Sequence, residues 1–312
     1  NGGSGEIVKT DEIVEADIVV IGGGGAGMAA AIKAKQAGKN VIILEKMPYL
    51  GGNTSKASGG MNAAGTKEQQ AAIEAETDEK VLESLKGSTV ENFIQDTMTG
   101  GHDLNDIDLV TKMAEMSADA IAWLKDLGAP LPKIAATGGT VHMYLHEPED
   151  GSAVGDYLVG KFSQKLDELG IEVYYETTAT ELIEEDGKVV GVKADSKKVN
   201  YTFKAGAVIL ATGGFGANEE MYCQYRPDLK GTVTTNAPGA TGDGIVMAQA
   251  LGAALVDIEQ IQLHPTVYQA NGLLVSERLR SNGAILVNLN GERFTNDLST
   301  RDAVSQAELA QP

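Results

Sequence analysis

A glycine-rich hexapeptide, Gly22 to Gly27, separates two segments of opposite character. Residues 17–21 (DIVVI) are a β-branched run, and residues 28–39 are an alanine-rich stretch that Gly38 would end as a helix. Residues 40–45 (NVIILE) have the pattern of a second buried strand. Strand, turn, helix and strand form the opening unit of a doubly wound parallel sheet, so the pattern predicts an α/β fold with a Rossmann-like domain.

The spacing of the glycines is that of a turn that binds a dinucleotide. Gly22 would permit the tight turn, Gly24 would let the backbone approach a pyrophosphate, and Gly27 would let the helix pack on the sheet. The phosphate charge would then lie at the positive N-terminus of the helix. Glu45, at the end of the second strand, would accept hydrogen bonds from the adenosine ribose. The alternative is a glycine turn that binds nothing, but the strand, helix and acid in register favour dinucleotide binding.

Charge and cysteine content exclude several other classes of protein. The net charge of −19 argues against binding to nucleic acid or to an anionic membrane, because both would be repelled. No apolar run approaches the roughly 20 residues of a membrane helix, so no membrane insertion is expected. The single cysteine, Cys223, excludes an internal disulfide, a Cys-ligated iron–sulfur cluster and a c-type haem within this chain.

The rest of the chain alternates helical and strand patterns. Residues 66–100 are acidic and helix-compatible, and helices are predicted at 107–128, 154–170 and 245–253. A strand at 171–176 and a hairpin around Asp186 and Gly187 follow, then a strand at 201–205 and a separate buried strand at 207–215. Residues 51–65 contain too much glycine for a regular element, and the pattern becomes irregular after about residue 254.

Further glycine clusters favour FAD over NAD as the dinucleotide. Residues 51–60, 211–216 and 241–243 offer more closely approaching backbone than one nicotinamide cofactor needs. With them, the chain resembles the flavoproteins of the fumarate reductase and succinate dehydrogenase group, most closely the soluble fumarate reductases of the flavocytochrome c type and the urocanate reductases. The motifs that carry the resemblance run in order from about residue 16 to the end: GGGGAG, EK, GGNTSKASGGMNAAG, ATGGF, TGDG, HPT, RSNGAILVN and TRD.

The resemblance implies non-covalent FAD and a set of contacts to it. Asn53 stands where the membrane-bound members carry a histidine that is covalently attached to the flavin. Glu45 is expected to hold the ribose, Ala179 to touch the adenine and Asp243 to contact the flavin region, while Gly59 and Gly60 pass close to the isoalloxazine. The predicted cofactor-binding residues are Gly22, Gly24, Ala26, Gly27, Glu45, Lys46, Asn53, Thr54, Gly59, Gly60, Ala179, Thr212, Gly213 and Asp243.

The resemblance also implies catalytic roles near the end of the chain. Arg301 is expected to be the acid that delivers a proton while N5 of reduced flavin delivers a hydride to the other alkene carbon. Glu277 and Arg280, in the segment SERLR, are expected to relay protons to Arg301. His264 and Ser276 are expected to bind a substrate carboxylate. The same segment contains Arg278, which is expected to be a solvated charge without a role.

The expected reaction is reduction of an α,β-unsaturated carboxylate, fumarate to succinate. Urocanate reduction remains open, because substrate choice depends on residues beyond this chain, whereas an aspartate oxidase or a ketosteroid dehydrogenase is disfavoured. A flavin-binding electron-transfer module without a substrate is the alternative from another class. For Arg301, Glu277 and Arg280 the competing interpretation is a set of exposed ion pairs, which contribute little to stability.

The expected domains are a linker-like tail at 1–15, an FAD-binding domain at 16–254 with a β-hairpin insertion, and the incomplete start of an α+β capping domain at 255–312. Motifs that full-length members carry beyond the arginine of TRD do not occur here. The electron donor is expected to be a domain or protein outside this chain, and family analogy favours an extracytoplasmic location, periplasmic or at the cell surface. No metal is expected: His142 and His146 have zinc-like spacing, but no Glu base accompanies them and Pro148 follows.

Overall fold

The computed structural model describes residues 8–136 and 140–311. Contacts divide the chain into two compact units. The first unit contains the chain up to Lys56 and Leu158–Ile261, and the second contains Ala57–Tyr157 and the chain from Gln262 onward. Residues 57–157 therefore group with the chain after residue 261 and not with the glycine turn. The expected domains at 16–254 and 255–312, which were defined by function, stay a prediction.

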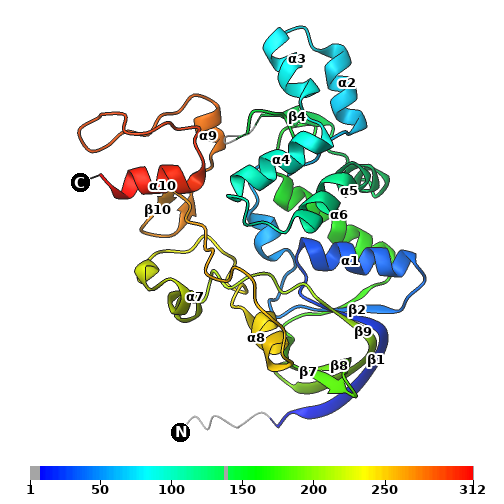
Figure 1. Ribbon diagram of the computed structural model, residues 1–312. Coiled ribbons are helices and arrows are strands. Elements are labelled where there is room, and N and C mark those ends of the chain that lie inside the picture. Colours follow the sequence, from blue (N-terminus) through cyan, green and yellow to red (C-terminus); the bar gives the residue numbers. More distant parts are fainter. Residues whose placement is uncertain (1–7, 137–139, 312) are drawn as a thin grey trace. The chain divides into compact units, whose positions relative to one another are not determined.

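The first unit is built on a six-stranded sheet in the order β6-β2-β1-β9-β8-β7 (Figure 1). The four strands β6 (Glu172–Tyr174), β2 (Val41–Leu44), β1 (Thr10–Ile21) and β9 (Val199–Leu210) are parallel. The hairpin of β7 (Thr178–Glu185) and β8 (Lys188–Asp195) continues the sheet in antiparallel register. The predicted α/β fold with a parallel sheet and a hairpin insertion is confirmed.

Two strands are longer than the sequence pattern predicted. β1 begins at Thr10, inside the segment expected to be a linker, because residues 10–16 pair with residues 199–205 of β9. Residues 1–7 of that expected linker lie outside the described residues. β9 is one strand and not two, since it pairs with β1 in the same register on both sides of Gly206. The predicted burial of its end was wrong, because Leu210 is 41% exposed.

Helices and a compact apolar core complete the first unit. Helix α1 (Gly25–Gln36) contacts β1, β2 and β9, and α8 (Asp243–Ala250) packs against β7. Between the strands, Ile21, Leu44 and Phe203 are among the buried core residues. Asp186 and Gly187 both have positive φ, 51° and 77°, as a two-residue hairpin turn requires. The remaining elements are η1 (Gly52–Lys56), α6 (Val154–Glu168), which reaches from the second unit into the first, α7 (Glu219–Tyr225) and η2 (Pro227–Leu229).

The second unit combines helices with short strands. Its helices α2 (Lys67–Ala75), α3 (Glu79–Lys86), α4 (Val90–Gly100) and α5 (Ile107–Asp126) each begin after a side chain that caps the first turn, namely Thr66, Asp78, Thr89 and Asp106. Strands β3 (Met61–Asn62), β5 (Leu145–Glu147) and β4 (Lys133–Ala135) form a three-stranded sheet.

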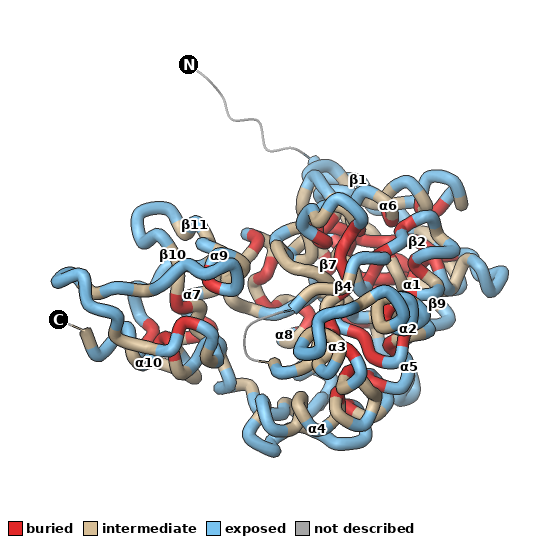
Figure 2. The backbone as a smooth tube through the Cα atoms, turned by 90° about the horizontal axis from the view of Figure 1, so that it is seen from above, coloured by how far each residue is buried: buried red, intermediate tan, exposed pale blue. Residues whose placement is uncertain are grey.

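The second unit ends in short elements joined by long loops. They are β10 (Val267–Tyr268), β11 (Leu273–Leu274), α9 (Arg278–Ser281) and α10 (Arg301–Leu309). The loop at 282–296 is mostly exposed, as its pale blue tube in Figure 2 shows. Among the residues that the structure describes, no helix combines the length and apolar character needed to cross a bilayer.

Candidate cofactor and active site

A cavity of about 230 Å³ opens in the first unit at the carboxyl ends of β1, β2 and β9. In open α/β sheets this edge is where ligands bind. Most of the predicted cofactor residues come together in its wall. They are Gly22, Gly24, Ala26, Glu45, Lys46, Asn53, Thr54, Ala179, Thr212, Gly213 and Asp243.

Different structural features account for glycine at the three positions 22, 24 and 27 of the turn. Gly22 has a φ of +106°, and a Cβ built on it would overlap the carbonyl oxygen of Ala211. A Cβ on Gly27 would overlap the carbonyl oxygen of Gly22, so Gly27 is needed for α1 to pack closely. A Cβ on Gly24 would meet nothing closer than 3.8 Å, where Gly51 O lies. Packing within the chain therefore explains Gly22 and Gly27 but leaves open space beside Gly24, which lines the cavity.

The first turn of α1 presents positive charge to the cavity. It carries no acidic side chain, so no carboxylate of its own compensates the helix dipole. The Gly25 amide donates to Thr54 Oγ1 at 2.9 Å, and both residues line the cavity. A helix N-terminus of this kind with small residues around it fits a pyrophosphate group.

Glu45 is held rigidly at the end of β2. The residue is 8% exposed, Oε2 accepts from the Gly23 amide at 2.8 Å, and Oε1 accepts from the Met47 amide at 2.7 Å. Each carboxylate oxygen has a second lone pair, so the group can still accept hydrogen bonds from ribose hydroxyls. The residues of the cavity thus fit the adenosine diphosphate half of FAD.

Lys46 and Asp243 form an ion pair in the cavity wall. Lys46 Nζ lies 2.7 Å from Asp243 Oδ2 and donates to Thr241 Oγ1 at 2.5 Å. Burial alone would raise the pKa of Asp243, but the hydrogen bonds from Lys46 and Thr241 outweigh it and lower that pKa. Asp243 is therefore held as a carboxylate.

The side-chain amide of Asn53 is used at both ends within the chain. Its Nδ2 donates to Asn236 Oδ1 at 2.6 Å, and its Oδ1 accepts from the Ala237 amide at 2.7 Å. These bonds fix the loop at 236–237 against η1, and Ala237 lines the cavity beside Asn53.

Three predicted cofactor residues do not line the cavity. Gly27 faces the Gly22 carbonyl, while Gly59 and Gly60 belong to the second unit. A Cβ on Gly60 would overlap the His146 carbonyl, which is explained by the pairing of β3 with β5. Beside Gly59, by contrast, a Cβ would meet nothing within 4 Å. Their predicted approach to the isoalloxazine stays a prediction.

Arg301, Glu277 and His264 meet in the second unit. Arg301 Nε donates to Glu277 Oε1, and its Nη1 donates to Gln262 Oε1 at 2.7 Å. His264 Nε2 lies 2.9 Å from the same Glu277 oxygen. The Thr266 amide donates to His264 Nδ1 at 3.2 Å, so the hydrogen of the neutral imidazole is on Nε2 and faces the carboxylate.

These neighbours keep Glu277 ionised. Burial by itself would raise its pKa, but hydrogen bonding from His264 and the backbone, together with the charge of Arg301, lowers the pKa to about 2. The Glu277 side chain is 24% exposed, whereas both members of the surface pair Lys193–Glu181 are more than half exposed. The cluster is thus more enclosed than an ordinary surface ion pair.

Arg280 and Ser276 take different positions around this cluster. Arg280 is 6% exposed and its Nη1 donates to the Asp297 carbonyl at 2.8 Å. Within residues 8–136 and 140–311, Arg280 makes no hydrogen bond or ion pair with Glu277 or Arg301. The Ser276 hydroxyl lies 3.2 Å from the Ser58 hydroxyl. Of the three residues of the predicted relay, only Glu277 and Arg301 are therefore in contact with each other.

Comparison with known proteins decides the family. The model of the FAD binding domain family matches residues 17–312, which is almost the whole chain. The chain belongs to the FAD binding domain family. It therefore binds FAD, and the predicted resemblance to the fumarate reductase group is confirmed.

Two curated relatives extend this comparison of the FAD-binding chain. It is 45% identical over 298 residues to the NADH:fumarate oxidoreductase of Klebsiella pneumoniae. The aligned residues cover 95% of this chain and 31% of that protein. It is 35% identical over 304 residues to the urocanate reductase of Eggerthella lenta, with coverage of 94% and 48%. The chain thus spans half or less of the length of these relatives.

A solved structure shows the same fold. The open conformation of a flavocytochrome c3 fumarate reductase superimposes with a TM-score of 0.83 at 40% identity, covering 96% of this chain and 51% of that one. The fold of the FAD-binding chain is therefore that of the flavoproteins it was predicted to resemble.

Arg278 is not the solvated charge that the sequence suggested. Its Nη1 donates to the Gly151 carbonyl at 2.7 Å, and its Nη2 lies 3.5 Å from Glu147 Oε2. The Glu147 side chain is only 2% exposed. The expectation failed because its partners lie more than 120 residues earlier in the chain.

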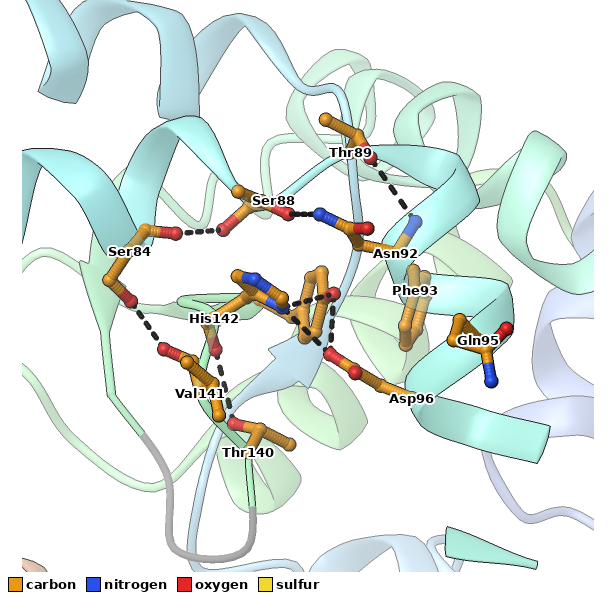
Figure 3. Close-up of polar contacts among 12 residues, drawn as sticks. Ser84, Ser88, Thr89, Asn92, Phe93, Gln95, Asp96, Thr140, Val141 and His142 are labelled. Carbon is orange, nitrogen blue, oxygen red and sulfur yellow. Dashed lines mark hydrogen bonds and ion pairs between the residues drawn. The ribbon is translucent and has the colours of Figure 1, made fainter. Parts of the chain in front are cut away.

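His142 and His146 each have a partner within the chain. They lie in and beside the extended strand β5 and not on a helix, and the described residues contain no group of three or more metal-ligating side chains. His142 Nδ1 lies 2.8 Å from Asp96 Oδ2, to which the Tyr144 hydroxyl also donates at 2.8 Å (Figure 3). His146 is buried, with Nε2 2.8 Å from Thr66 Oγ1.

Sequence reasoning missed several residues of the cavity wall. Thr177 and Thr178 precede the predicted Ala179, and Met47 follows the EK motif, so proximity in sequence to a motif was an available signal. Gly239 lies just before TGDG, and a Cβ there would crowd Met47 and Lys46. The other wall residues not predicted are Ile21, Gly25, Leu44, Tyr49, Gly52, Ala211, Ala237, Ala240 and Met247.

Proposed function

We propose that the protein containing this chain is an FAD-dependent reductase of an α,β-unsaturated carboxylate, with fumarate as substrate and succinate as product. The observation that carries the proposal is the contact of Arg301 with Glu277 in a partly enclosed cluster of the second unit. A relative that is 45% identical and named for the reduction of fumarate supports it.

FAD, when bound, supplies the redox chemistry, because its reduced form donates a hydride to an electron-poor alkene carbon. Gly24, the N-terminus of α1 and Glu45 would hold its adenosine diphosphate half. We propose that the attachment is non-covalent, since an asparagine amide is not a nucleophile and Asn53 already uses both ends of its amide within the chain.

Arg301 would bind the substrate and deliver the proton. Glu277 on Nε and Gln262 on Nη1 orient its guanidinium, and Nη2 makes no hydrogen bond to another described residue. Nη2 is therefore available to a substrate. A guanidinium has a pKa above about 12, so it gives up a proton only to a strongly basic acceptor in contact with it, such as the developing carbanion of a reduced alkene.

Glu277 would return a proton to Arg301. Its pKa is low partly because Arg301 is positive, so loss of the Arg301 proton would raise the pKa of Glu277 and make it a better proton carrier. Arg280 remains a proposed member of this relay, although its guanidinium bonds to the Asp297 carbonyl.

His264 and Ser276 are the proposed contacts of a substrate carboxylate. Nε2 of His264 faces Glu277 in this structure, and we propose that a substrate carboxylate would accept its hydrogen in place of Glu277. Ser276 contributes a hydroxyl next to Ser58. Preorganised donors of this kind would bind the substrate and polarise its alkene toward hydride attack.

Urocanate reduction is the second candidate, because a relative at 35% identity is named for it. Urocanate carries one carboxylate and an imidazole, so it needs fewer cations than fumarate. The electron donor is proposed to be a domain or protein outside this chain, and an extracytoplasmic location remains a proposal by analogy with the family.

Anaerobic reoxidation of the flavin tests the proposed function. The flavin of the full-length protein is reduced chemically, and fumarate, urocanate or buffer is then added while flavin absorbance is followed. Rapid reoxidation by fumarate alone is expected. Reoxidation by urocanate alone would select the second candidate, and no acceleration by either acid over buffer would contradict the reductase function.

A further inference from the structure

Glu147 is a buried carboxylate outside the proposed reaction. It ends β5, its side chain is 2% exposed, and it is paired in register with Lys133 of β4. Lys133 Nζ lies 3.4 Å from Glu147 Oε2, and Arg278 Nη2 lies 3.5 Å from the same oxygen. A carboxylate removed from water is unfavourable unless cations and hydrogen bonds compensate it. The contacts from Lys133 and Arg278 therefore stabilise the buried charge of Glu147.

Arg278 binds the turn that follows β5. Its Nη1 donates to the Gly151 carbonyl at 2.7 Å while Nη2 faces Glu147, so one guanidinium binds both ends of the segment 147–151. Gly151 has a φ of +67°, and a Cβ there would come within 2.7 Å of Lys133 Nζ and 3.3 Å of Arg278 Nη2. Both atoms are the ends of flexible side chains that can shift, but the left-handed backbone of Gly151 strains any other residue at this position.

The same arginine belongs to the shortest helix near the proposed active site. Helix α9 has four residues and no side-chain cap, and a helix of that length is not stable by itself. Side chains two positions apart point to nearly opposite sides of a helix. Arg278 therefore fastens one side of α9 to the segment 147–151, and Arg280 fastens the other side to the Asp297 carbonyl.

Glu277 immediately precedes Arg278 and depends on this helix for its position. The Ser281 amide donates to the Glu277 carbonyl at 2.9 Å, and the Arg278 amide donates to Ser276 Oγ at 3.3 Å. Movement of α9 would thus move both the carboxylate that faces Arg301 and the hydroxyl of Ser276.

We propose that Glu147 and Arg278 are a positioning pair that holds Glu277 against Arg301. This inference rests on the proposed function for its effect on catalysis, but the anchoring of α9 is a property of the fold itself. Among the described residues, neither one forms a hydrogen bond or ion pair with Arg301, so we infer that both act through Glu277.

A mutant cycle in the full-length protein tests whether Arg278 acts through Glu277. Arg278→Met keeps the apolar stem and removes the guanidinium, and it is expected to lower kcat with the active enoate by roughly tenfold to 100-fold, the scale of loss when a catalytic group is misplaced. In a Glu277→Gln background the same change is expected to lower kcat less than about twofold. An equal loss in both backgrounds would overturn the positioning role.

Controls separate positioning from misfolding. Arg226→Met removes a guanidinium from an ion pair in the first unit whose carboxylate, Asp228, is 60% exposed, and it is expected to leave kcat unchanged. FAD absorbance per protein is compared in every variant. Arg278→Lys keeps the charge beside Glu147 but cannot bind Glu147 and the Gly151 carbonyl at once, so an intermediate kcat is expected. If the lysine variant has full FAD content and is as impaired as the methionine variant, the result still supports the anchor, because both contacts of the guanidinium are then needed.

Hydrogen exchange tests the anchor without any activity. Amide exchange in a peptide covering residues 277–283 is expected to accelerate at least tenfold in Arg278→Met and in Glu147→Gln, but not in Arg226→Met. Unchanged exchange in the first two variants would overturn the anchor. If the wild type reduces neither fumarate nor urocanate, the proposed function fails, and this exchange measurement still decides the anchor.

Discussion

Glu277 and Arg301 lie 24 residues apart in the sequence, and their side chains share a hydrogen bond from Nε to Oε1. The same carboxylate oxygen lies 2.9 Å from His264 Nε2. One oxygen thus meets basic groups from two other segments of the chain. A surface ion pair has only two exposed partners. The approach of both Arg301 and His264 to one oxygen of Glu277 therefore distinguishes a candidate site from a solvated cluster.

Acid sensitivity follows from the position of Glu277. Its pKa in the folded protein is about 2, below the ordinary value of 4.5, so folding favours the ionised form. Its contribution to the free energy of unfolding is therefore complete above pH 4.5 and is lost as the pH falls toward 2. Urea unfolding between pH 5 and pH 2.5 is expected to show a smaller loss of stability in Glu277→Gln than in the wild type.

Glu181→Gln is the matched control for this measurement, because Glu181 belongs to an exposed pair with Lys193. Its pH profile should follow that of the wild type. Parallel profiles for Glu277→Gln and the wild type across the same range would contradict the assigned environment of Glu277.

Gly24 and Gly27 should respond differently to alanine. At Gly27 a methyl group overlaps the Gly22 carbonyl, so Gly27→Ala is expected to destabilise the fold by roughly 1–3 kcal/mol. Gly24 has a φ of −78°, which alanine adopts freely, and its Cβ would meet no atom of the chain within 3.8 Å. Gly24→Ala should therefore keep its stability without FAD but bind FAD at least about tenfold more weakly, a loss near 1.4 kcal/mol.

Urea unfolding of the apo-protein and FAD titration measure the two effects separately. Gly160→Ala is the control, because Gly160 lies within α6 and a Cβ there meets nothing within 4 Å. It should be neutral or stabilising. Normal FAD affinity in Gly24→Ala would remove the assignment of that glycine to the pyrophosphate.

Glu45 should contribute to stability as well as to FAD binding. Glu45→Ala leaves the buried Gly23 amide without its acceptor, which costs about 1–3 kcal/mol. FAD affinity should fall in addition, because the ribose loses its acceptor. Titration of FAD at a temperature where the variant is fully folded separates the two losses, and unchanged affinity there would contradict the ribose contact.

The glycine turn and its flanking strands were predictable because each depends on local sequence. Gly22, Gly24 and Gly27 occupy backbone positions that restrict side chains or keep space open, and the β-branched run at 17–21 is a strand by its own preference. The early start of β1 at Thr10 was not predictable, since the segment 10–16 pairs with residues 198–205, far along the chain.

Long-range partners also explain what was missed around the active site. Arg278 looks like a surface charge until Glu147 and Gly151 are placed beside it, and Gln262 has no motif that connects it with Arg301. Arg280 fits a family relay by sequence, yet its contact is a backbone carbonyl. Motifs gave the residue types of the site, but their contacts depend on tertiary packing that no local pattern records.

The most direct test of the proposed function is anaerobic reoxidation of chemically reduced flavin by fumarate in the Arg301→Ala variant of the full-length protein, with Arg226→Ala as the matched arginine control. The proposed mechanism predicts that Arg301→Ala retains FAD, with the flavin absorbance of the wild type, and loses fumarate-dependent reoxidation by at least about 100-fold, the lower end of the range for a general acid. Reoxidation of Arg301→Ala by fumarate at the wild-type rate would contradict the assignment of Arg301 as the acid.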